Sequence, residues 1–148
     1  MSGKLFISIL LVFVAVFGAA LWYFQLYAYY EDVTGLETVE VQGVAVPVSD
    51  YRGVDAETSP NKLRGCFTVD PAAFDAVPLA ETPEPLVAPP ALDCFDAEQI
   101  ARDLEAGAAV AYLAGDETPE GATGYEIVRM IAVYADGRAF LWRHYRED

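Results

Sequence analysis

The feature that most constrains this chain is an uninterrupted apolar segment near its N-terminus. Residues 5–24 contain no charged side chain, and the nearest charges are Lys4 before the segment and Glu31 after it. A helix of about 20 apolar residues matches the thickness of a bilayer core. In lipid, each unpaired backbone group is costly, so we expect the segment to be helical. The sequence therefore predicts a transmembrane anchor at residues 1–30, followed by a single domain at residues 31–148.

A cleaved signal peptide is the alternative interpretation of the same segment. Lys4 supplies a positive start, and Gly18-Ala19-Ala20 resembles a cleavage site. The apolar run continues beyond these small residues, however, and ends in a cluster of aromatic side chains of the type that gathers at membrane interfaces. The cluster consists of Trp22, Tyr23, Phe24, Tyr27, Tyr29 and Tyr30. It favours a retained anchor.

The flanking charges predict the orientation of the anchor. Lys4 lies on one side, whereas Glu31 and Asp32 lie on the other. Because basic residues stay on the cytoplasmic side, we expect the N-terminus in the cytoplasm and the domain outside it. In a bacterium this means an inner-membrane protein, surrounded by lipid at its anchor, with a periplasmic C-terminal domain.

The domain is strongly acidic. Residues 31–148 hold all 23 acidic residues and 8 of the 9 basic ones, a net charge of −15. Such a surface repels nucleic acids and anionic lipid headgroups, so neither is expected as a partner. It suits a partner with a basic surface. A coat that only keeps the domain soluble is the alternative, because the carboxylates are spread along the chain.

Two cysteines, Cys66 and Cys94, are predicted to form a disulfide. They do not form a Cys-x-x-Cys motif, and an even number of cysteines outside the cytoplasm is typical of disulfide pairing. The bond would close a loop of roughly 29 residues and contribute about 3.5 kcal/mol in the chain-entropy description. Metal binding by the two thiols is the alternative, but it needs further ligands, and His144 is the only histidine.

The pattern along the domain predicts an α+β fold, a mostly antiparallel sheet with one helix packed on it. Asp96 and Gln99 form a capping box that begins the helix, and Gly107 is placed to end it. Asp136-Gly137 is a strong hairpin signal. Strands are expected at 38–48 with a bulge at Gly43, and at 63–69, 108–114, 126–134 and 139–145. Polar or proline-rich loops are expected at 50–62, 70–93 and 118–124.

No residue pattern in the domain is typical of catalysis. His144 alternates with Trp142 and Phe140 and is interpreted as a sheet-face histidine. The carboxylates of residues 50, 55 and 57, and those of residues 117 and 120, match no calcium-loop signature and are interpreted as solvated. We therefore expect no catalytic, cofactor-binding or metal-binding residue, and no enzymatic activity.

Several segments resemble a family of single-pass alphaproteobacterial membrane proteins that is classed as a domain of unknown function. They are residues 25–31 (QLYAYYE), 55–60 (DAETSP) with 64–67 (RGCF), 93–100 (DCFDAEQI) and 132–138 (AVYADGR). The resemblance implies an inner-membrane anchor, a periplasmic domain and a recurring pair of cysteines, here Cys66 and Cys94. It implies no catalytic residue.

Two functions remain open from the sequence. The first is a non-catalytic accessory or assembly subunit of an inner-membrane complex, with respiratory complexes as one candidate class. The alternative is an envelope enzyme or small-ligand sensor with a pocket walled by the proline-rich loop 70–93, since long loops often carry function.

Overall fold

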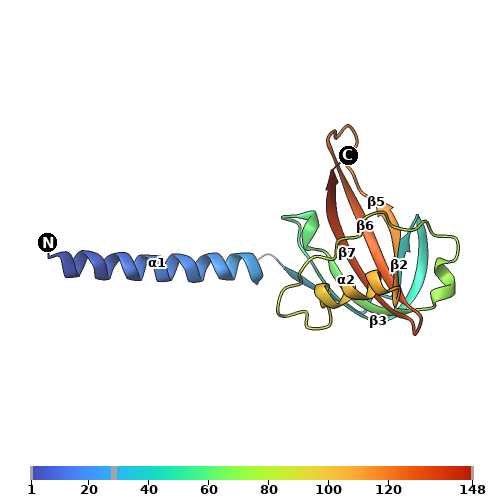
Figure 1. Cartoon of the computed structure of the whole chain (residues 1–148), viewed down its shortest axis with the longest axis horizontal. Helices are drawn as coiled ribbons and strands as arrows, with labels where there is room; N and C mark the ends of the chain where they lie inside the picture. The colour runs from blue at the N-terminus through green and yellow to red at the C-terminus, as the bar shows by residue number, and fades with distance from the viewer. Residues whose placement is uncertain (1, 28–29, 148) are drawn as a thin grey trace.

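The computed structural model describes residues 2–27 and 30–147. It begins with one long helix, α1 (Gly3–Leu26), which stands clear of the rest of the molecule (Figure 1). Ser2 caps it by accepting a hydrogen bond from the Leu5 N–H at 3.3 Å. No residue of α1 is buried, and the helix is long and apolar enough to cross a membrane. By length and composition alone, a signal sequence would also meet this description.

The remainder is an α+β domain, as the sequence predicts. Its strands form one antiparallel sheet with the order β1-β3-β4-β7-β6-β5, and β2 also pairs with β3. The strands are β1 (Glu31–Thr34), β2 (Thr38–Val41), β3 (Val44–Asp55), β4 (Arg64–Val69), β5 (Ala109–Asp116), β6 (Tyr125–Tyr134) and β7 (Arg138–Glu147). Two short 3₁₀ turns, η1 (Pro60–Lys62) and η2 (Pro71–Phe74), lie before and after β4.

The single strand predicted at residues 38–48 is wrong, because the chain reverses within it. Gln42 and Gly43 both have positive φ, 51° and 78°, and join β2 to β3 as a tight hairpin. Two central residues with positive φ define the turn whose twist suits a two-residue hairpin. Gly43 therefore marks a turn and not a bulge.

The polar loop predicted at residues 50–62 is also wrong in its first half. β3 continues to Asp55 and pairs with β4 on one side and with β1, which the sequence pattern missed, on the other. The ladder is irregular between Ser49 and Arg52, where Asp50 has a φ of 55°. An extra residue at a bulge shifts the alternation of side chains, which hides the strand from a period-two pattern.

The sheet curls until its two ends meet. At the tip of the β2–β3 hairpin, the Gln42 N–H donates to the Ala114 carbonyl of β5 at 2.7 Å. The Gln42 side-chain amide donates to the Leu113 carbonyl at 2.7 Å. These contacts join the β2–β3 hairpin to β5 at one corner, so the sheet forms a partly closed barrel.

Two apolar cores lie on opposite faces of the curled sheet. The inner core fills the barrel and includes Phe67, Phe74 and Leu141. The outer core lies beneath α2 (Ala97–Ala106) and includes Ile100, Met130 and Trp142. Figure 1 shows α2 crossing this outer face.

The ends of α2 agree largely with the predicted caps. Asp96 accepts a hydrogen bond from the Gln99 N–H at 3.1 Å, and Gly107 adopts the left-handed conformation with a φ of 77°. The reciprocal half of the capping box is wrong. The Gln99 side chain instead donates to Asp103 at 2.9 Å, since Asp103 is one turn along the same helix face.

The proline-rich loop is fixed to the domain at several points. The Cys66–Cys94 disulfide, which agrees with the sequence expectation, joins β4 to the end of the loop. Residues 78–80 pair with the edge of β5, where Leu113 N–H donates to Pro78 and Ala80 N–H donates to Ala111. Arg64 is 3% exposed and donates to the Leu86 and Val87 carbonyls at 3.0 and 3.1 Å. The loop is therefore part of the folded domain.

Candidate functional site at the open end of the barrel

A cluster of charged side chains lies at the open end of the inner core. Glu117, which follows β5, accepts from Arg129 Nη1 of β6 at 2.7 Å. Its other carboxylate oxygen pairs with Arg143 Nε of β7. Both arginine side chains are only 16% exposed, and that of Glu117 is 31% exposed. Ion pairs shielded from water in this way are stronger than pairs on an open surface.

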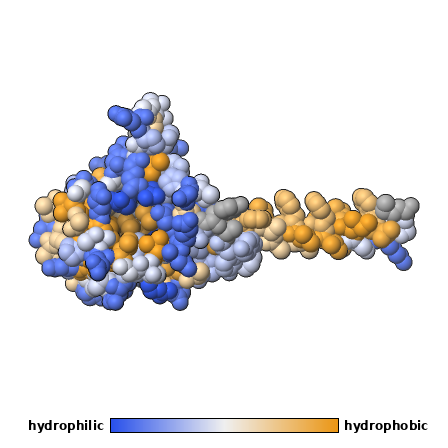
Figure 2. Space-filling model, turned by 180° about the vertical axis from the view of Figure 1, so that it is seen from behind, coloured by the Kyte–Doolittle hydropathy of each residue, from blue (hydrophilic) through white to orange (hydrophobic). Residues whose placement is uncertain are grey.

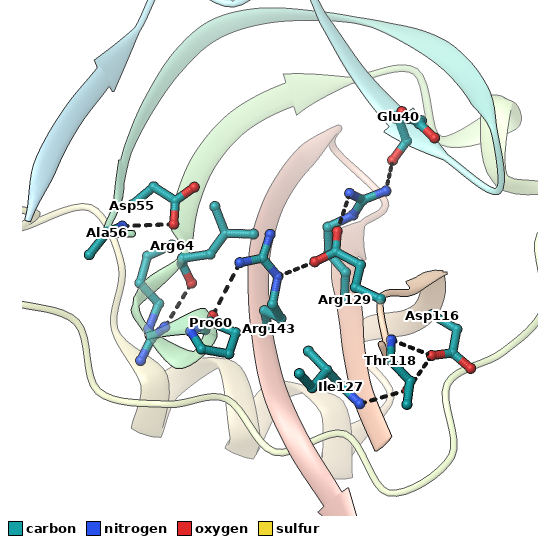
Figure 3. A network of polar contacts seen from close by, with 12 residues as sticks. Glu40, Asp55, Ala56, Pro60, Arg64, Asp116, Thr118, Ile127, Arg129 and Arg143 are labelled. Carbon is teal, nitrogen blue, oxygen red and sulfur yellow. Dashed lines mark hydrogen bonds and ion pairs between the residues drawn. The ribbon is translucent and has the colours of Figure 1, made fainter. Parts of the chain in front are cut away.

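Backbone carbonyls hold the two guanidinium groups in place. Arg129 Nη2 donates to the Glu40 carbonyl of β2 at 2.6 Å, and Arg143 Nη1 donates to the Pro60 carbonyl at 3.3 Å. Figure 3 shows Arg143 between Pro60 and Arg129, with Glu40 on the far side of Arg129. The Arg129–Glu40 bond spans the barrel from β6 to β2, so the cluster also helps to close the barrel.

Tyr51 of β3 lies beside this cluster. Its ring rests on Gly53 and Gly65, which face each other on β3 and β4, and it stacks on Phe67 at 5.7 Å between ring centroids. A Cβ on Gly65 would lie 2.6 Å from the Tyr51 hydroxyl oxygen. The two glycines thus leave the space that the phenol occupies.

The phenol of Tyr51 stays protonated at neutral pH. The residue is 4% exposed, and burial, followed by the negative charge of Asp55, raises the pKa of Tyr51 to about 12. Its hydroxyl makes no hydrogen bond to any residue that the structure describes. It is therefore an available hydrogen-bond donor at a buried position.

These side chains border a cavity of about 210 Å³. The polar groups on its wall come from Thr38, Glu40, Tyr51, Asp55, Arg129 and Arg143, and the apolar groups include Val39, Leu63 and Leu141. A concave, mostly apolar site with a few convergent polar groups is the usual form of a small-molecule site. This cavity is the best candidate site in the described part of the domain.

Sequence reasoning missed Tyr51, Arg129 and Arg143 as site residues. One signal was present for the arginines: each falls in the same alternation as the inner-core residues of its strand, Ile131 on β6 and Leu141 on β7. A charged residue in an inward-facing position of a strand marks the end of a core or a polar site within it. No comparable signal distinguishes Tyr51.

The residues that the sequence singled out are distributed over different parts of the domain. Asp55 and Glu117 belong to the cluster, whereas Asp50, Glu57 and Glu120 are exposed elsewhere. Across residues 2–27 and 30–147, no group of three or more His, Cys, Asp or Glu side chains is arranged to hold a metal ion.

His144 lies on the outer face of β7 and is 3% exposed. Its Nδ1 lies 2.9 Å from the Tyr145 carbonyl and donates to it, whereas its Nε2 has no hydrogen-bond partner among the described residues. An open hollow of about 830 Å³ adjoins it, walled partly by Thr82, Pro83 and Glu84 of the proline-rich loop. The loop thus borders a hollow, as the alternative interpretation of the sequence requires, but it contributes no buried polar group to the wall.

The aromatic cluster predicted at the membrane boundary divides into two groups. Trp22, Tyr23 and Tyr27 are exposed at the end of α1. Tyr30 instead packs against the outer core of the domain, with Lys62 Nζ 5.1 Å from its ring centroid. Tyr29 lies outside the described residues. Tyr30 therefore belongs to the domain and not to the anchor.

The basic residues of the domain form ion pairs with only some of its acidic residues. Every basic side chain of the domain is engaged within it, and the partners of Arg52, Arg102, Arg138 and Arg146 are Asp93, Glu98, Asp136 and Glu126. Among residues 31–57, seven carboxylates form no ion pair to a described residue, and six of them are exposed: Glu31, Asp32, Glu37, Glu40, Asp50 and Glu57. The seventh is Asp55.

Comparison with known proteins identifies a family for the domain. No curated protein and no solved structure matches the chain. A family model described as a family of unknown function, DUF6446, matches residues 33–147. The match covers most of the chain, including all strands from β2 to β7. The chain is therefore a member of DUF6446.

Proposed function

We propose that this protein is a membrane-anchored, non-catalytic accessory or assembly subunit of an inner-membrane complex. Its periplasmic domain docks through the exposed carboxylates of residues 31–57, hereafter the acidic surface, onto a basic face of its partner. The observation that carries the proposal is that residues 31–57 bring together six exposed carboxylates with no basic partner within the described part of the domain. Unpaired surface charge of one sign steers and orients a partner of the opposite sign.

The short connection between α1 and β1 supports a partner in the same membrane. Only residues 27–30 separate the end of α1 from the start of β1. Extended chain spans at most about 3.5 Å per residue, so the domain stays within roughly 15 Å of the end of the helix. The acidic surface begins with β1 and is therefore held close to the membrane, where a second membrane protein presents its own periplasmic face.

The outward surface of α1 supports an anchor that contacts lipid or other helices. Its large apolar side chains are exposed, except for the half-buried Leu26 at its end, and Figure 2 shows apolar residues along its length. A helix that is apolar all round and buried against nothing in its own chain is suited to a bilayer.

Charge replacement on the acidic surface tests the proposal. The variant Asp32→Asn/Glu37→Gln/Asp50→Asn removes three exposed charges from the acidic surface and none from the cavity wall. Asn suits position 50, where φ is 55°, because Asn tolerates the left-handed region. We expect less partner to copurify with this variant from membranes solubilised in mild detergent.

A charge-matched control distinguishes docking from net charge. The variant Asp75→Asn/Glu81→Gln/Glu84→Gln removes three exposed charges from the proline-rich loop. It should retain the partner at the wild-type level. Equal loss of partner in both variants would show that only the net charge of the domain affects binding. It would contradict docking through a specific face.

A further inference from the structure

The cavity at the open end of the barrel has polar groups that the fold leaves unused. Asp55 accepts from the Ala56 N–H through Oδ1 at 2.8 Å, and its second oxygen has no hydrogen-bond partner among the described residues. The Tyr51 hydroxyl is likewise unpaired. Arg143 uses Nε and Nη1 for Glu117 and Pro60, which leaves Nη2 free to donate. The wall therefore offers donors from Tyr51, Arg143 and the buried, unpaired Nε of Arg129, and an acceptor from Asp55.

The charges around the cavity are separated into positive and negative groups. Arg129 and Arg143 contribute two positive charges, and Glu40, Asp55 and the adjoining Glu117 contribute three negative ones. Glu117 pairs with both arginines. In the described structure, the Asp55 carboxylate lies more than 4.0 Å from the guanidinium nitrogens of both Arg129 and Arg143. A site that holds a positive group apart from a negative one favours a ligand with the same property.

The rest of the wall is apolar. Val39, Leu63 and Leu141 are buried members of the inner core and line the cavity, and Leu36 lies at its exposed rim. The face opposite α2 shows apolar residues gathered between hydrophilic margins (Figure 2). A ligand in this cavity therefore needs an apolar part as well as its two charged ends.

We propose that this cavity binds a small apolar α-amino acid as its zwitterion. The ligand carboxylate accepts hydrogen bonds from Arg143 and the Tyr51 hydroxyl. Its ammonium group donates to Asp55, and its side chain contacts Leu63 and Leu141. This proposal does not depend on the docking proposal above.

The volume restricts the ligand to this size. Sites for drug-sized molecules have volumes of about 300–1,000 Å³. A cavity of about 210 Å³ is smaller than these and suits a single amino acid of the size of valine or leucine. Guanidinium groups recognise carboxylates through paired donors, and a buried hydrogen bond to a charged group is among the stronger ones.

Titration calorimetry with three related probes tests the proposal on the full chain in non-ionic detergent. The probes are L-leucine, 4-methylpentanoate, which is leucine without its amine, and isoamylamine, which is leucine without its carboxylate. We expect L-leucine to bind more tightly than either analogue. Tyr51→Phe and Asp55→Asn should each weaken L-leucine binding by roughly tenfold, the effect of one hydrogen bond to a charged group.

Comparison of the variants with the analogues separates the two ends of the site. Asp55→Asn should leave 4-methylpentanoate binding unchanged, whereas Tyr51→Phe should weaken it. Asp75→Asn, an exposed carboxylate away from the cavity, should change neither. Absence of L-leucine binding to the wild type would overturn the proposal. Binding that is equal for L-leucine and 4-methylpentanoate, or that neither Tyr51→Phe nor Asp55→Asn alters, would also overturn it.

Discussion

Tyr51 and Gly65 occupy one shared space: a Cβ on Gly65 would lie 2.6 Å from the Tyr51 hydroxyl oxygen and 3.0 Å from its Cζ. The phenol lies over the β3–β4 ladder because both facing positions, 53 and 65, lack side chains. The bulge between Ser49 and Arg52 breaks the regular pairing just beside Tyr51. The bulge and the two glycines thus determine the position of the Tyr51 hydroxyl at the open end of the barrel.

Gly65→Ala should displace Tyr51 and destabilise the domain. The added methyl group forces the ring from a well-packed position, and overpacking of this type costs about 2 kcal/mol. The free energy of unfolding of the full chain in detergent, measured by denaturant titration, checks the loss. Thr68→Ala is the control, since Thr68 is exposed on the same strand and its truncation should have little effect. Equal stability of Gly65→Ala and wild type would refute the close contact.

Removal of the Cys66–Cys94 disulfide should weaken the domain and loosen the proline-rich loop. The bond joins residues 28 apart in the sequence. In the chain-entropy description, a loop of that size contributes about 3.5 kcal/mol. The double variant Cys66→Ala/Cys94→Ala should lose roughly this amount without leaving a free thiol. Free thiols detected stoichiometrically on both cysteines in wild-type protein protected from reductants would contradict the bond.

Arg64→Met should release the proline-rich loop. Arg64 donates to the carbonyls of Leu86 and Val87, and also to that of Leu63 at 2.7 Å. Burial lowers the pKa of Arg64 to about 10, which still leaves it charged at neutral pH. Loss of these hydrogen bonds removes one buried and two partly buried contacts to backbone carbonyls and should cost about 3 kcal/mol.

Hydrogen exchange measures the local effect of this variant. Amides of residues 79–92 should exchange faster in Arg64→Met than in wild type. The control Arg138→Gln removes an exposed ion pair to Asp136, which contributes less than about 1 kcal/mol. If exchange in the loop were the same in Arg64→Met and in the control, Arg64 would not be what fixes the loop.

The Tyr134–Asp103 hydrogen bond should give stability an acid dependence. The Tyr134 hydroxyl of β6 donates to the Asp103 carboxylate of α2 at 2.6 Å. This bond lowers the pKa of Asp103 below its ordinary value of 3.8. A lowered folded-state pKa means that the contribution is present above about pH 4 and is lost as pH falls through the folded value.

Asp103→Asn tests this dependence. Below about pH 4 the free energy of unfolding should fall less steeply with decreasing pH in Asp103→Asn than in wild type. Asp75→Asn, whose carboxylate is exposed, should retain the wild-type slope. An identical slope in Asp103→Asn and wild type would show that the bond does not contribute.

Features that depend on neighbouring residues could be predicted from the sequence. The Asp136-Gly137 turn joins β6 to β7, and Gly137 has a φ of 95°. Asp96 and Gly107 mark the ends of α2 for the same reason: each cap is satisfied within a few residues. The apolar length of α1 is likewise a local property.

Features that depend on contacts between residues distant in the sequence could not be predicted from the sequence. The Gln42–Leu113 bond spans 71 residues and the Arg129–Glu40 bond spans 89 residues, so neither leaves a mark in a local window of the sequence. The cavity requires both, because they bring β2 against β5 and β6. The bulge beside Tyr51 further hid the second half of β3. The candidate site was therefore missed although the fold class was predicted.

The most direct test of the docking account is the salt dependence of partner recovery from native membranes. Screening lengths fall from about 8 Å at physiological ionic strength to about 3 Å at 1 M salt. The full chain, extracted in mild detergent at low salt, should copurify with a membrane protein at a fixed ratio. The ratio should fall steeply as salt rises, and should already be low for Asp32→Asn/Glu37→Gln/Asp50→Asn. If the protein purifies alone at every salt concentration and turns over a defined small molecule, the docking account is wrong.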